Sequence, residues 1–403
     1  MNSKRHFLLH PVVWLAALGY FVDIYDLLLF SIIRIPSLND LGVVDPTGTG
    51  LLILNTQMFG LLLGGILWGV LGDKLGRTRV LFFSIALYSI GNLLNGFVQT
   101  GTQYAIIRFI AGVGLAGELG AGITLVSELL PKNKRGLGTS LVAGFGLTGA
   151  VFAFFIAQWF PWRICYFIGG GMGLLLLTLR MSVFESTLYK KLASKNHVTK
   201  GNFLMLFNKK ERFMRYVRSI LIGLPTWFVV GILISFSPEF AYHLGIEQSI
   251  DPGKGIMISY AAIAVGDVAI GLLSNRLGSR KKALHIFYII TIAGMIVFFT
   301  ATTPWQLYLS TGIMGFGTGF WAVFVTIGAE NFGTNLRATA ATTIPNMVRG
   351  SLNIISAIFL FFSNQLSYVN GGIVTGVIVM LVTYWAIAGL QETFDRDLDF
   401  LEE

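Results

Sequence analysis

Long apolar stretches separated by short polar loops run along almost the whole chain. Each stretch is about 20 residues long, the length at which an α-helix crosses the hydrocarbon core of a bilayer. The predicted spans lie at residues 12–33, 50–72, 80–98, 104–129, 137–158, 163–184, 219–241, 253–274, 283–302, 306–330, 339–362 and 371–390. The pattern therefore predicts an all-α membrane protein with 12 transmembrane helices and with both termini on one side of the membrane.

The charged residues agree with this interpretation and add an orientation. Only 12% of the 403 residues are charged and 54% are hydrophobic, whereas a soluble domain carries about 25% charged residues. With the N-terminus inside, the cytoplasmic side holds all of the 29 Lys and Arg residues except Arg34, Arg108, Arg163, Lys254 and Arg349. This asymmetry predicts a multi-pass protein of the bacterial inner membrane with both termini in the cytoplasm. It also accounts for the net charge of +9 without a nucleic-acid partner.

Two loop motifs recur at one fixed spacing. GVLGDKLGRTR begins at Gly69 and GLLSNRLGSRK begins at Gly271, 202 residues later. ELLPKNKRG at Glu128 and ENFGTNLRA at Glu330 show the same displacement. The shared spacing predicts two duplicated six-helix halves, at residues 1–185 and 218–403. The basic linker 186–217 is expected to be either an amphipathic helix on the inner leaflet or a solvated tether, and the acidic tail is expected in the cytoplasm.

These motifs also carry a family resemblance. GVLGDKLGR resembles the signature loop between helices 2 and 3 of the major facilitator superfamily. RFIAGVGLAGELGAG, from Arg108, resembles the fourth helix of its metabolite:proton symporter and sugar-porter-like branches. FES at Phe184 and QETF at Gln391 resemble the signatures that end each half, without their proline. The resemblance implies two pseudo-symmetric six-helix bundles. The fifth span lacks the Gly-Pro pair of multidrug exporters, which counts against that class of transporter.

Ionisable residues inside the predicted spans are the candidates for chemistry, because a charge in hydrocarbon costs at least a few kcal/mol. The carboxylates are Asp23 and Asp26 in the first span, Glu118 in the fourth and Asp267 in the eighth. Asp23 and Asp26 share one helical face, and their repulsion favours protonation of one of them. We expect these four residues to carry the coupled proton. The alternative is a structural role in ion pairs or hydrogen bonds between helices.

The buried arginines suggest pairings and a substrate. Counting depth along the helices places Arg108 near Asp26 and Arg349 near Asp267, so we expect these two ion pairs. A fixed guanidinium favours a carboxylate ligand, so Arg349 is the main candidate for substrate binding, in a span that we expect to be broken at Pro345. The further candidates for the substrate site are Arg108, Tyr25, Trp227, Trp321, Asn346 and Asn353.

The repeated loops are interpreted as a cytoplasmic gate. The resemblance implies that charge pairs and helix ends in these loops latch the two halves together in the outward-facing state. The candidate gate residues are Gly69, Asp73, Gly76, Arg77, Glu128, Arg135, Glu330 and Arg337.

The function predicted from the sequence is secondary active transport by alternating access. We expect proton-coupled import of a small carboxylate-bearing metabolite, such as an organic acid, an amino acid or a zwitterion. The alternative is a proton-driven exporter or antiporter of a related solute, such as a carboxylate siderophore. With one cysteine and no GxSxG or HExxH motif, we expect no enzyme, cofactor or metal. We also expect a monomer whose partners are the small-molecule substrate, protons or sodium ions, and the lipid bilayer.

Overall fold

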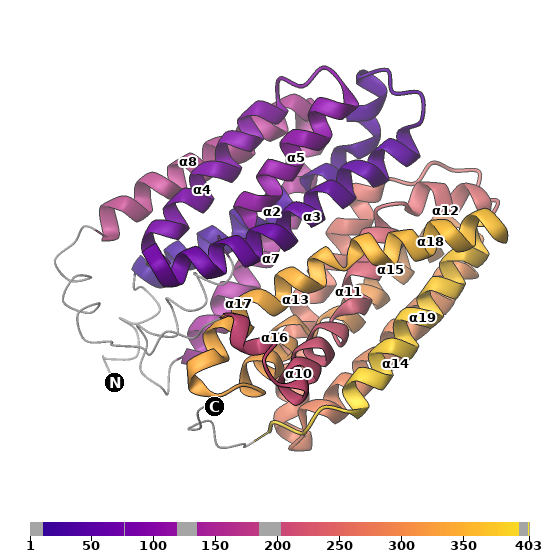
Figure 1. Cartoon of the computed structure of the whole chain (residues 1–403). Coiled ribbons are helices and arrows are strands. Elements are labelled where there is room, and N and C mark those ends of the chain that lie inside the picture. The colour runs from indigo at the N-terminus through magenta and orange to yellow at the C-terminus, as the bar shows by residue number, and fades with distance from the viewer. Residues whose placement is uncertain (1–10, 76, 119–134, 185–202, 395–401, 403) are drawn as a thin grey trace, which may run out of the picture.

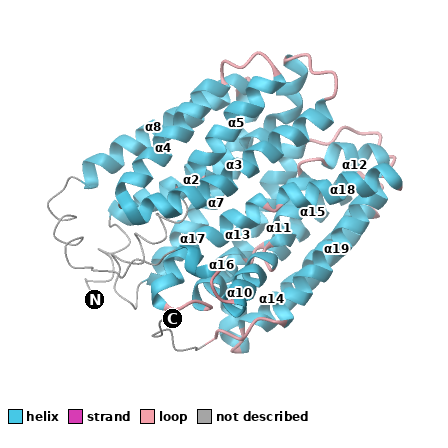
Figure 2. Cartoon of the chain, in the orientation of Figure 1, coloured by secondary structure: helices cyan, strands magenta, loops and turns pink. Residues whose placement is uncertain are grey.

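The structure is a computed structural model that describes residues 11–75, 77–118, 135–184, 203–394 and 402. Every regular element in these ranges is helical (Figure 2). In the first half of the chain the elements are α2 (Pro11–Asp40), α3 (Pro46–Leu75), α4 (Arg77–Asn95), α5 (Gly101–Leu115), α7 (Arg135–Trp159) and α8 (Trp162–Phe184). In the second half they are η3 (Phe203–Leu206), α10 (Lys210–Leu221), α11 (Leu224–Phe228), η4 (Val229–Ile234), α12 (Ser237–His243), α13 (Pro252–Leu277), α14 (Arg280–Phe299), α15 (Pro304–Thr318), α16 (Trp321–Glu330), α17 (Thr334–Gly350), α18 (Leu352–Gln365) and α19 (Tyr368–Ala388).

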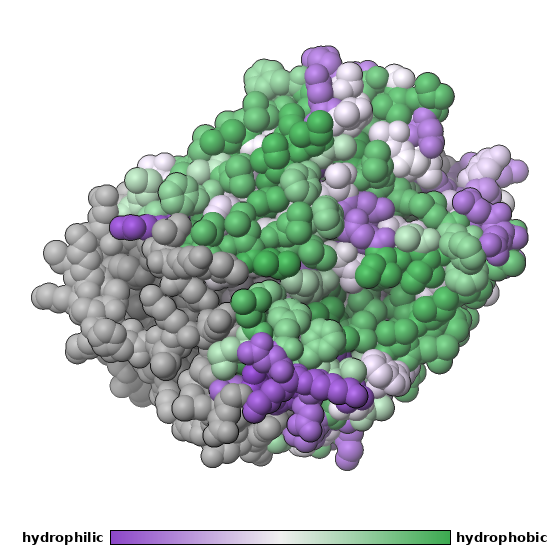
Figure 3. Space-filling view, viewed as in Figure 1, coloured by the Kyte–Doolittle hydropathy of each residue, from purple (hydrophilic) through white to green (hydrophobic). Residues whose placement is uncertain are grey.

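The helices match the predicted spans closely. Ten helical segments among the described residues are long and apolar enough to cross a membrane. The third predicted span is α4, whose apolar stretch is shorter, and the fourth begins as α5 and continues into residues outside the described ranges. Figure 3 shows a face that is mostly hydrophobic, with hydrophilic residues gathered toward the helix ends. Large apolar side chains such as Phe83 and Leu272 are about two-thirds exposed, which fits contact with lipid.

The helices form two groups that are continuous in sequence (Figure 1). In the first, α2 packs on α7 and α8, and α5 packs on α3 and α4. In the second, α15 packs on α13 and α14, and α18 packs on α19. The groups meet where α3 contacts α17 and α18, and where α13 contacts α2 and α7. The space between the groups is therefore bounded by helices from both halves of the chain.

The loop that precedes the fourth and the tenth span starts a helix in the same way. The Thr100 hydroxyl accepts a hydrogen bond from the Gln103 amide at the start of α5. Thr303 does the same for Gln306 at the start of α15 and forms a full capping box with it. Each cap satisfies a backbone N–H that the first turn leaves free. These local signals fix where the helices begin at the end of the molecule that is predicted to face outward.

The described part of the linker contains the short turn η3 and the beginning of α10. After the short turn η3, α10 begins at Lys210 and leads directly into the seventh span. Arg212 and Arg215 on α10 form ion pairs with Glu402 in the acidic tail, at 3.2 and 2.9 Å. Burial acts to raise the pKa of the Glu402 carboxyl, but the hydrogen bonds and charge of these two arginines hold it below its ordinary value. Glu402 is thus tied to the start of the second helical group.

Three spans of the second half are interrupted near their middle. The seventh passes from α11 into the π-helical turn η4, and the tenth breaks between α15 and α16 at Gly319 and Phe320. The eleventh changes from α17 to α18 at Ser351. The expected break at Pro345 is wrong, since this proline lies inside α17. Proline removes only one backbone hydrogen bond, and neighbouring helices make it tolerable in a membrane span.

Candidate functional site

A small cavity lies between the two helical groups, next to the interrupted spans. Its polar and aromatic lining residues are Tyr20, Thr226, Trp227, Tyr260, Thr318, Trp321 and Arg349. Apolar side chains of α2, α7 and α13 complete the wall. The cavity volume that the centre of a water molecule can occupy is about 20 Å³. This is room for about one water molecule. A metabolite can therefore enter this space only when the two groups move apart.

The interrupted helices explain why these side chains meet. Thr226 and Trp227 lie on α11, just before the π-helical turn. Trp321 is the first residue of α16, directly after the break in the tenth span. Arg349 precedes the last residue of α17. Each break lets the chain present a side chain toward the space between the halves, as discontinuous helices do at the midplane of transporters.

Arg349 is paired across the two halves. Its Nη2 lies 3.5 Å from Asp23 Oδ2 on α2, and both side chains are at most 1% exposed. The expected pair between Arg349 and Asp267 is therefore wrong. The rotation of each helix about its axis decides which neighbour a side chain meets, and depth along the helix does not determine it. Asp23 Oδ1 and the Nε and Nη1 atoms of Arg349 have no hydrogen-bond partner among the described residues.

Asp267 has a different partner, the beginning of a broken helix. Its Oδ1 accepts a hydrogen bond from the backbone N–H of Ala322, at 3.0 Å, in the first turn of α16. Gly266 and Gly319 bring the eighth and tenth spans into backbone contact at this level. The carboxylate thus satisfies one of the N–H groups exposed by the break and interacts favourably with the helix dipole.

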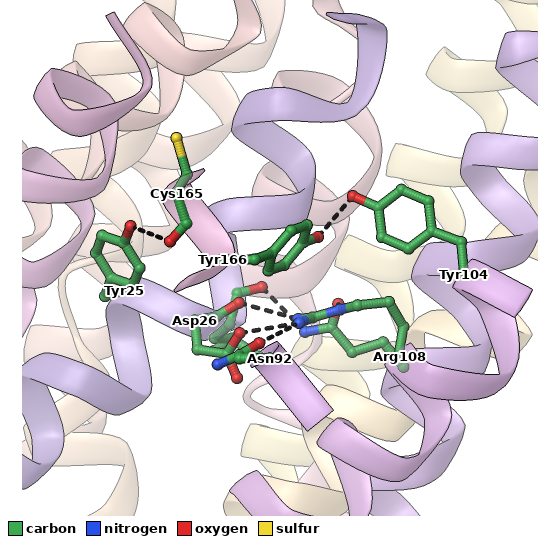
Figure 4. Close-up of polar contacts among 9 residues, drawn as sticks. Tyr25, Asp26, Asn92, Tyr104, Arg108, Cys165 and Tyr166 are labelled. Atoms are coloured by element: carbon green, nitrogen blue, oxygen red, sulfur yellow. Dashed lines mark hydrogen bonds and ion pairs between the residues drawn. The ribbon is translucent and has the colours of Figure 1, made fainter. Parts of the chain in front are cut away.

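The expected pair between Asp26 and Arg108 is present inside the first helical group (Figure 4). Arg108 Nη1 lies 2.9 Å from Asp26 Oδ1, and Nη2 donates to the Asp26 carbonyl at 3.0 Å. Arg108 also donates to Asn92 at 3.1 Å and to Gln57 at 3.3 Å. Its guanidinium faces the ring of Tyr166. This arginine is fully buried and nearly saturated with partners, so it is held rigidly within one half.

Glu118 belongs to a second buried pair, and the sequence interpretation missed its partner. Arg180 on α8 donates to Glu118 Oε1 at 2.5 Å and to Oε2 at 3.0 Å. Arg180 also donates to the Leu15 carbonyl on α2 at 3.1 Å. Gly19 packs directly against the pair, where a Cβ atom would collide with both side chains. Arg180 was counted among the cytoplasmic cations because it lies close to the end of its span.

The remaining substrate candidates lie away from the cavity. Tyr25 donates to the Cys165 carbonyl at 2.8 Å inside the first group (Figure 4). Asn346 donates to the Ala116 carbonyl at 2.9 Å and so connects the eleventh span to the fourth. Asn353 donates to the Gly350 carbonyl at 3.0 Å, beside the change from α17 to α18. Trp227, Trp321 and Arg349 are thus the substrate candidates that line the cavity.

The predicted gate is only partly within the described residues. Gly76 and Glu128, and the side chains of Asp73, Arg77 and Arg135, lie outside them. Gly69 faces the methyl group of Thr343 across the two halves. Glu330 pairs with Arg280 on α14, at 2.6 Å, inside the second group. Arg337 lies in the first turn of α17, where its amide donates to the Gly333 carbonyl.

A cluster at the opposite end of the molecule connects the halves, and the sequence interpretation missed it. Arg34, near the end of α2, forms an ion pair with Glu239 on α12, at 2.7 Å, and is 1% exposed. It also donates to the Ser235 carbonyl at 3.1 Å, while Thr47 donates to Glu239 at 3.2 Å. We call these four residues the outer latch. An arginine directly after the first predicted span was the available signal.

Comparisons with known proteins agree with the geometry. A model of the Major Facilitator Superfamily matches residues 16–357. The chain is 26% identical over 373 residues to the niacin transporter NiaP of Acinetobacter baylyi, covering 82% of each protein. It is 28% identical over 275 residues to the sialic acid transporter NanX of Escherichia coli, covering 66% of this chain and 65% of the relative. It is 33% identical over 187 residues to the benzoate transport protein of Acinetobacter baylyi, covering 44% and 40%.

The matched region begins in the first span and ends in the eleventh, so it covers most of both helical groups and all residues that line the cavity between them. The relatives are transporters of small metabolites and not enzymes. The chain therefore belongs to the Major Facilitator Superfamily, as a multi-pass membrane protein that transports small metabolites.

Proposed function

We propose that this protein imports a small carboxylate-bearing metabolite together with a proton. The observation that carries the proposal is the ion pair between Asp23 and Arg349, which joins the two halves beside the central cavity. Arg349 is the only charged residue in the described lining of that cavity. An anionic substrate that enters would therefore meet a cation whose present partner is a protein carboxylate.

The electrostatics of this ion pair can couple substrate binding to proton binding. An unpaired charge in a low-dielectric interior costs several kcal/mol, so Arg349 needs an anionic partner at each stage. A substrate carboxylate can replace Asp23 as the partner of Arg349 if Asp23 becomes neutral. Asp23 becomes neutral at low cost by binding a proton. The proton and the substrate then enter together, and neither leaves a buried charge unpaired.

Alternating access follows from where the halves are connected. The outer latch of Arg34, Thr47, Ser235 and Glu239 holds them together at the end predicted to face outward. In our proposal, residues 1–185 and 218–403 rock against each other around the cavity, with 186–217 as the linker. Opening the outer latch admits the substrate, and the predicted cytoplasmic gate closes meanwhile. The protein acts as a monomer in the bacterial inner membrane, with its termini in the cytoplasm.

The relatives support the choice of substrate class. Niacin, sialic acid and benzoate, which the relatives' names give as their cargo, all carry a carboxylate group. A cavity with one arginine and no acidic lining residue among those described suits such anions.

The test uses purified protein in liposomes with a mixture of small acids outside. We expect an inward proton gradient to drive accumulation of an anionic metabolite. Asp23→Asn should abolish this gradient-driven accumulation while retaining exchange of internal for external substrate, because Asn at this position cannot bind and release the proton. Asp40→Asn is the matched control on the same helix, since Asp40 is half exposed.

Two outcomes would contradict the proposal. Gradient-driven accumulation by Asp23→Asn equal to wild type would remove Asp23 from the coupling step. Release of preloaded substrate as protons enter would show export by antiport, and the direction proposed here would be wrong. Dissipating the sodium gradient in the same liposomes separates proton coupling from sodium coupling.

A further inference from the structure

We infer that the substrate of the central cavity is a planar, aromatic-type acid that carries a hydrogen-bond acceptor away from its carboxylate. The inference rests on the proposed function, because it takes Arg349 as the carboxylate ligand. It adds a second recognition element, formed by the indole N–H groups of Trp227 and Trp321. Both tryptophans line the cavity, and neither Nε1 atom has a hydrogen-bond partner among the described residues.

An unpaired indole N–H is informative because it can only donate. Trp has no acceptor atom in its ring system, and a buried donor without a partner is costly to the folded protein. Other described tryptophans show the usual solution, since Trp68 donates to the Val113 carbonyl and Trp162 donates to Asp40. The two cavity tryptophans thus have N–H donors that are available to a ligand. Thr226 Oγ1 is a third group of the cavity wall without a hydrogen-bond partner among the described residues.

These donors come from different helices than the arginine. Arg349 is on α17, whereas Trp227 is on α11 and Trp321 begins α16. A ligand that satisfies all of them needs an anionic group for Arg349 and a lone pair elsewhere, such as a ring nitrogen or a carbonyl oxygen. Benzoate satisfies the first requirement only, while pyridine-3-carboxylate satisfies both.

The walls favour a flat ligand body. Tyr20, Tyr260, Trp227 and Trp321 contribute four aromatic side chains, and the remaining lining is mostly Ile and Leu. Aromatic rings pack well on one another in stacked or edge-on arrangements. Such rings could also hold a quaternary ammonium group, but two unpaired N–H donors are positive at their hydrogen atoms and would repel a cation. The observations therefore favour a neutral acceptor over the ammonium group of a betaine.

The test is calorimetric titration of the full-length protein in lipid nanodiscs with four ligands. They are pyridine-3-carboxylate, benzoate, pyridine-3-carboxamide and glycine betaine. We expect pyridine-3-carboxylate to bind at least about tenfold more tightly than benzoate, because benzoate leaves a buried donor unpaired. Trp227→Phe or Trp321→Phe should reduce this ratio toward one, mainly by weakening the binding of pyridine-3-carboxylate. Trp385→Phe, at an exposed position outside the cavity, is the matched control.

The outcomes separate this inference from the proposal it rests on. If the two acids bind equally and both lose affinity in Arg349→Gln, the carboxylate site stands and the acceptor site is wrong. If the carboxamide binds as tightly as the acid and Arg349→Gln has no effect, the carboxylate site itself is wrong. Tighter binding of glycine betaine than of either aromatic acid, or no binding of either acid at millimolar concentration, would overturn the inference.

Discussion

Buried charges inside the first half and buried charges at the boundary between the halves are paired differently in this transporter. In the first half, Arg108 pairs with Asp26 and Arg180 pairs with Glu118, so each of these buried arginines has an acid of its own half. In the second half, Arg349 pairs only with Asp23 of the first half. Asp267, a partly exposed acid of the second half, accepts a hydrogen bond from the Ala322 backbone N–H instead.

This difference distinguishes charge pairs that stay together during transport from charge pairs that must separate. A pair inside one half can persist through alternating access, since its members move together. A pair between the halves must break or change partners whenever the halves separate. Arg349 also has the weaker attachment, a single 3.5 Å contact, whereas Arg108 donates four hydrogen bonds. The comparison assigns stability to the pairs inside the first half and substrate transport to the pair of Asp23 and Arg349 between the halves.

The largest expected effect is on stability, from Arg108→Ala. The substitution leaves Asp26 buried without its cation, which costs about 3–5 kcal/mol of unfolding free energy. Thermal unfolding of the purified protein in detergent would show a clearly lower Tm. The control is Arg163→Ala, because Arg163 and Asp40 form a partly exposed pair worth at most about 1 kcal/mol. Equal Tm values for the two variants would show that the buried pair of Arg108 and Asp26 does not stabilise the first half.

Next in size is the effect of Arg349→Ala on transport. We expect uptake to fall by about 100-fold, because the substrate carboxylate loses its charge partner and a buried charged hydrogen bond is worth about 1.5–3 kcal/mol. The Tm should change much less than in Arg108→Ala, since Arg349 makes one long contact. The measurement is initial uptake into liposomes alongside thermal unfolding. If Arg349→Ala lowered the Tm strongly but transported normally when folded, Arg349 would have a structural role and not a transport role.

A smaller, conformational effect is expected from Glu239→Gln. Removing the charge weakens the outer latch by about 1–3 kcal/mol and favours separation of the halves at that end. Spin labels at the exposed residues Asn39 and Glu247, one in each half, would report a larger population of long distances.

The control for the latch is Gln158→Leu, which removes a neutral contact to Asp251 at the same end. It should shift the distances less than Glu239→Gln. Identical distance distributions in both variants would mean that the ion pair does not hold this end closed.

The smallest effect is expected from Asp267→Ala. Losing the acceptor for the Ala322 amide should cost about 1 kcal/mol, as for other helix caps, and lower the Tm slightly. Asp267→Asn retains an oxygen acceptor and should recover most of the loss. If Asp267→Asn instead abolished proton-driven uptake at unchanged Tm, Asp267 would be a proton carrier, as the sequence interpretation suggested.

Several features of the fold could be predicted from the amino-acid sequence. Hydropathy located the spans, because the cost of placing polar backbone and side chains in lipid acts on each segment separately. The pair of Asp26 and Arg108 could also be predicted, since both belong to one half and lie at matching depth. The superfamily was recognisable from GVLGDKLGR and the repeated loops, and the family comparison confirmed it.

The partners of Arg349, Glu118 and Arg34 could not be predicted in the same way. Arg180 lies near the end of its span, and Glu239 is more than 200 residues from Arg34 in sequence. The expected pairing of Arg349 with Asp267 is wrong, because each residue has a different partner.

The amino-acid sequence by itself determined the spans, the internal repeat and the set of buried charges. The tertiary structure decided which charges meet, where three spans break, and that Trp227, Trp321 and Arg349 share one cavity. The physical reason is that insertion into a membrane depends on the composition of each segment. Pairing depends instead on the rotation of every helix about its axis and on how the two halves dock.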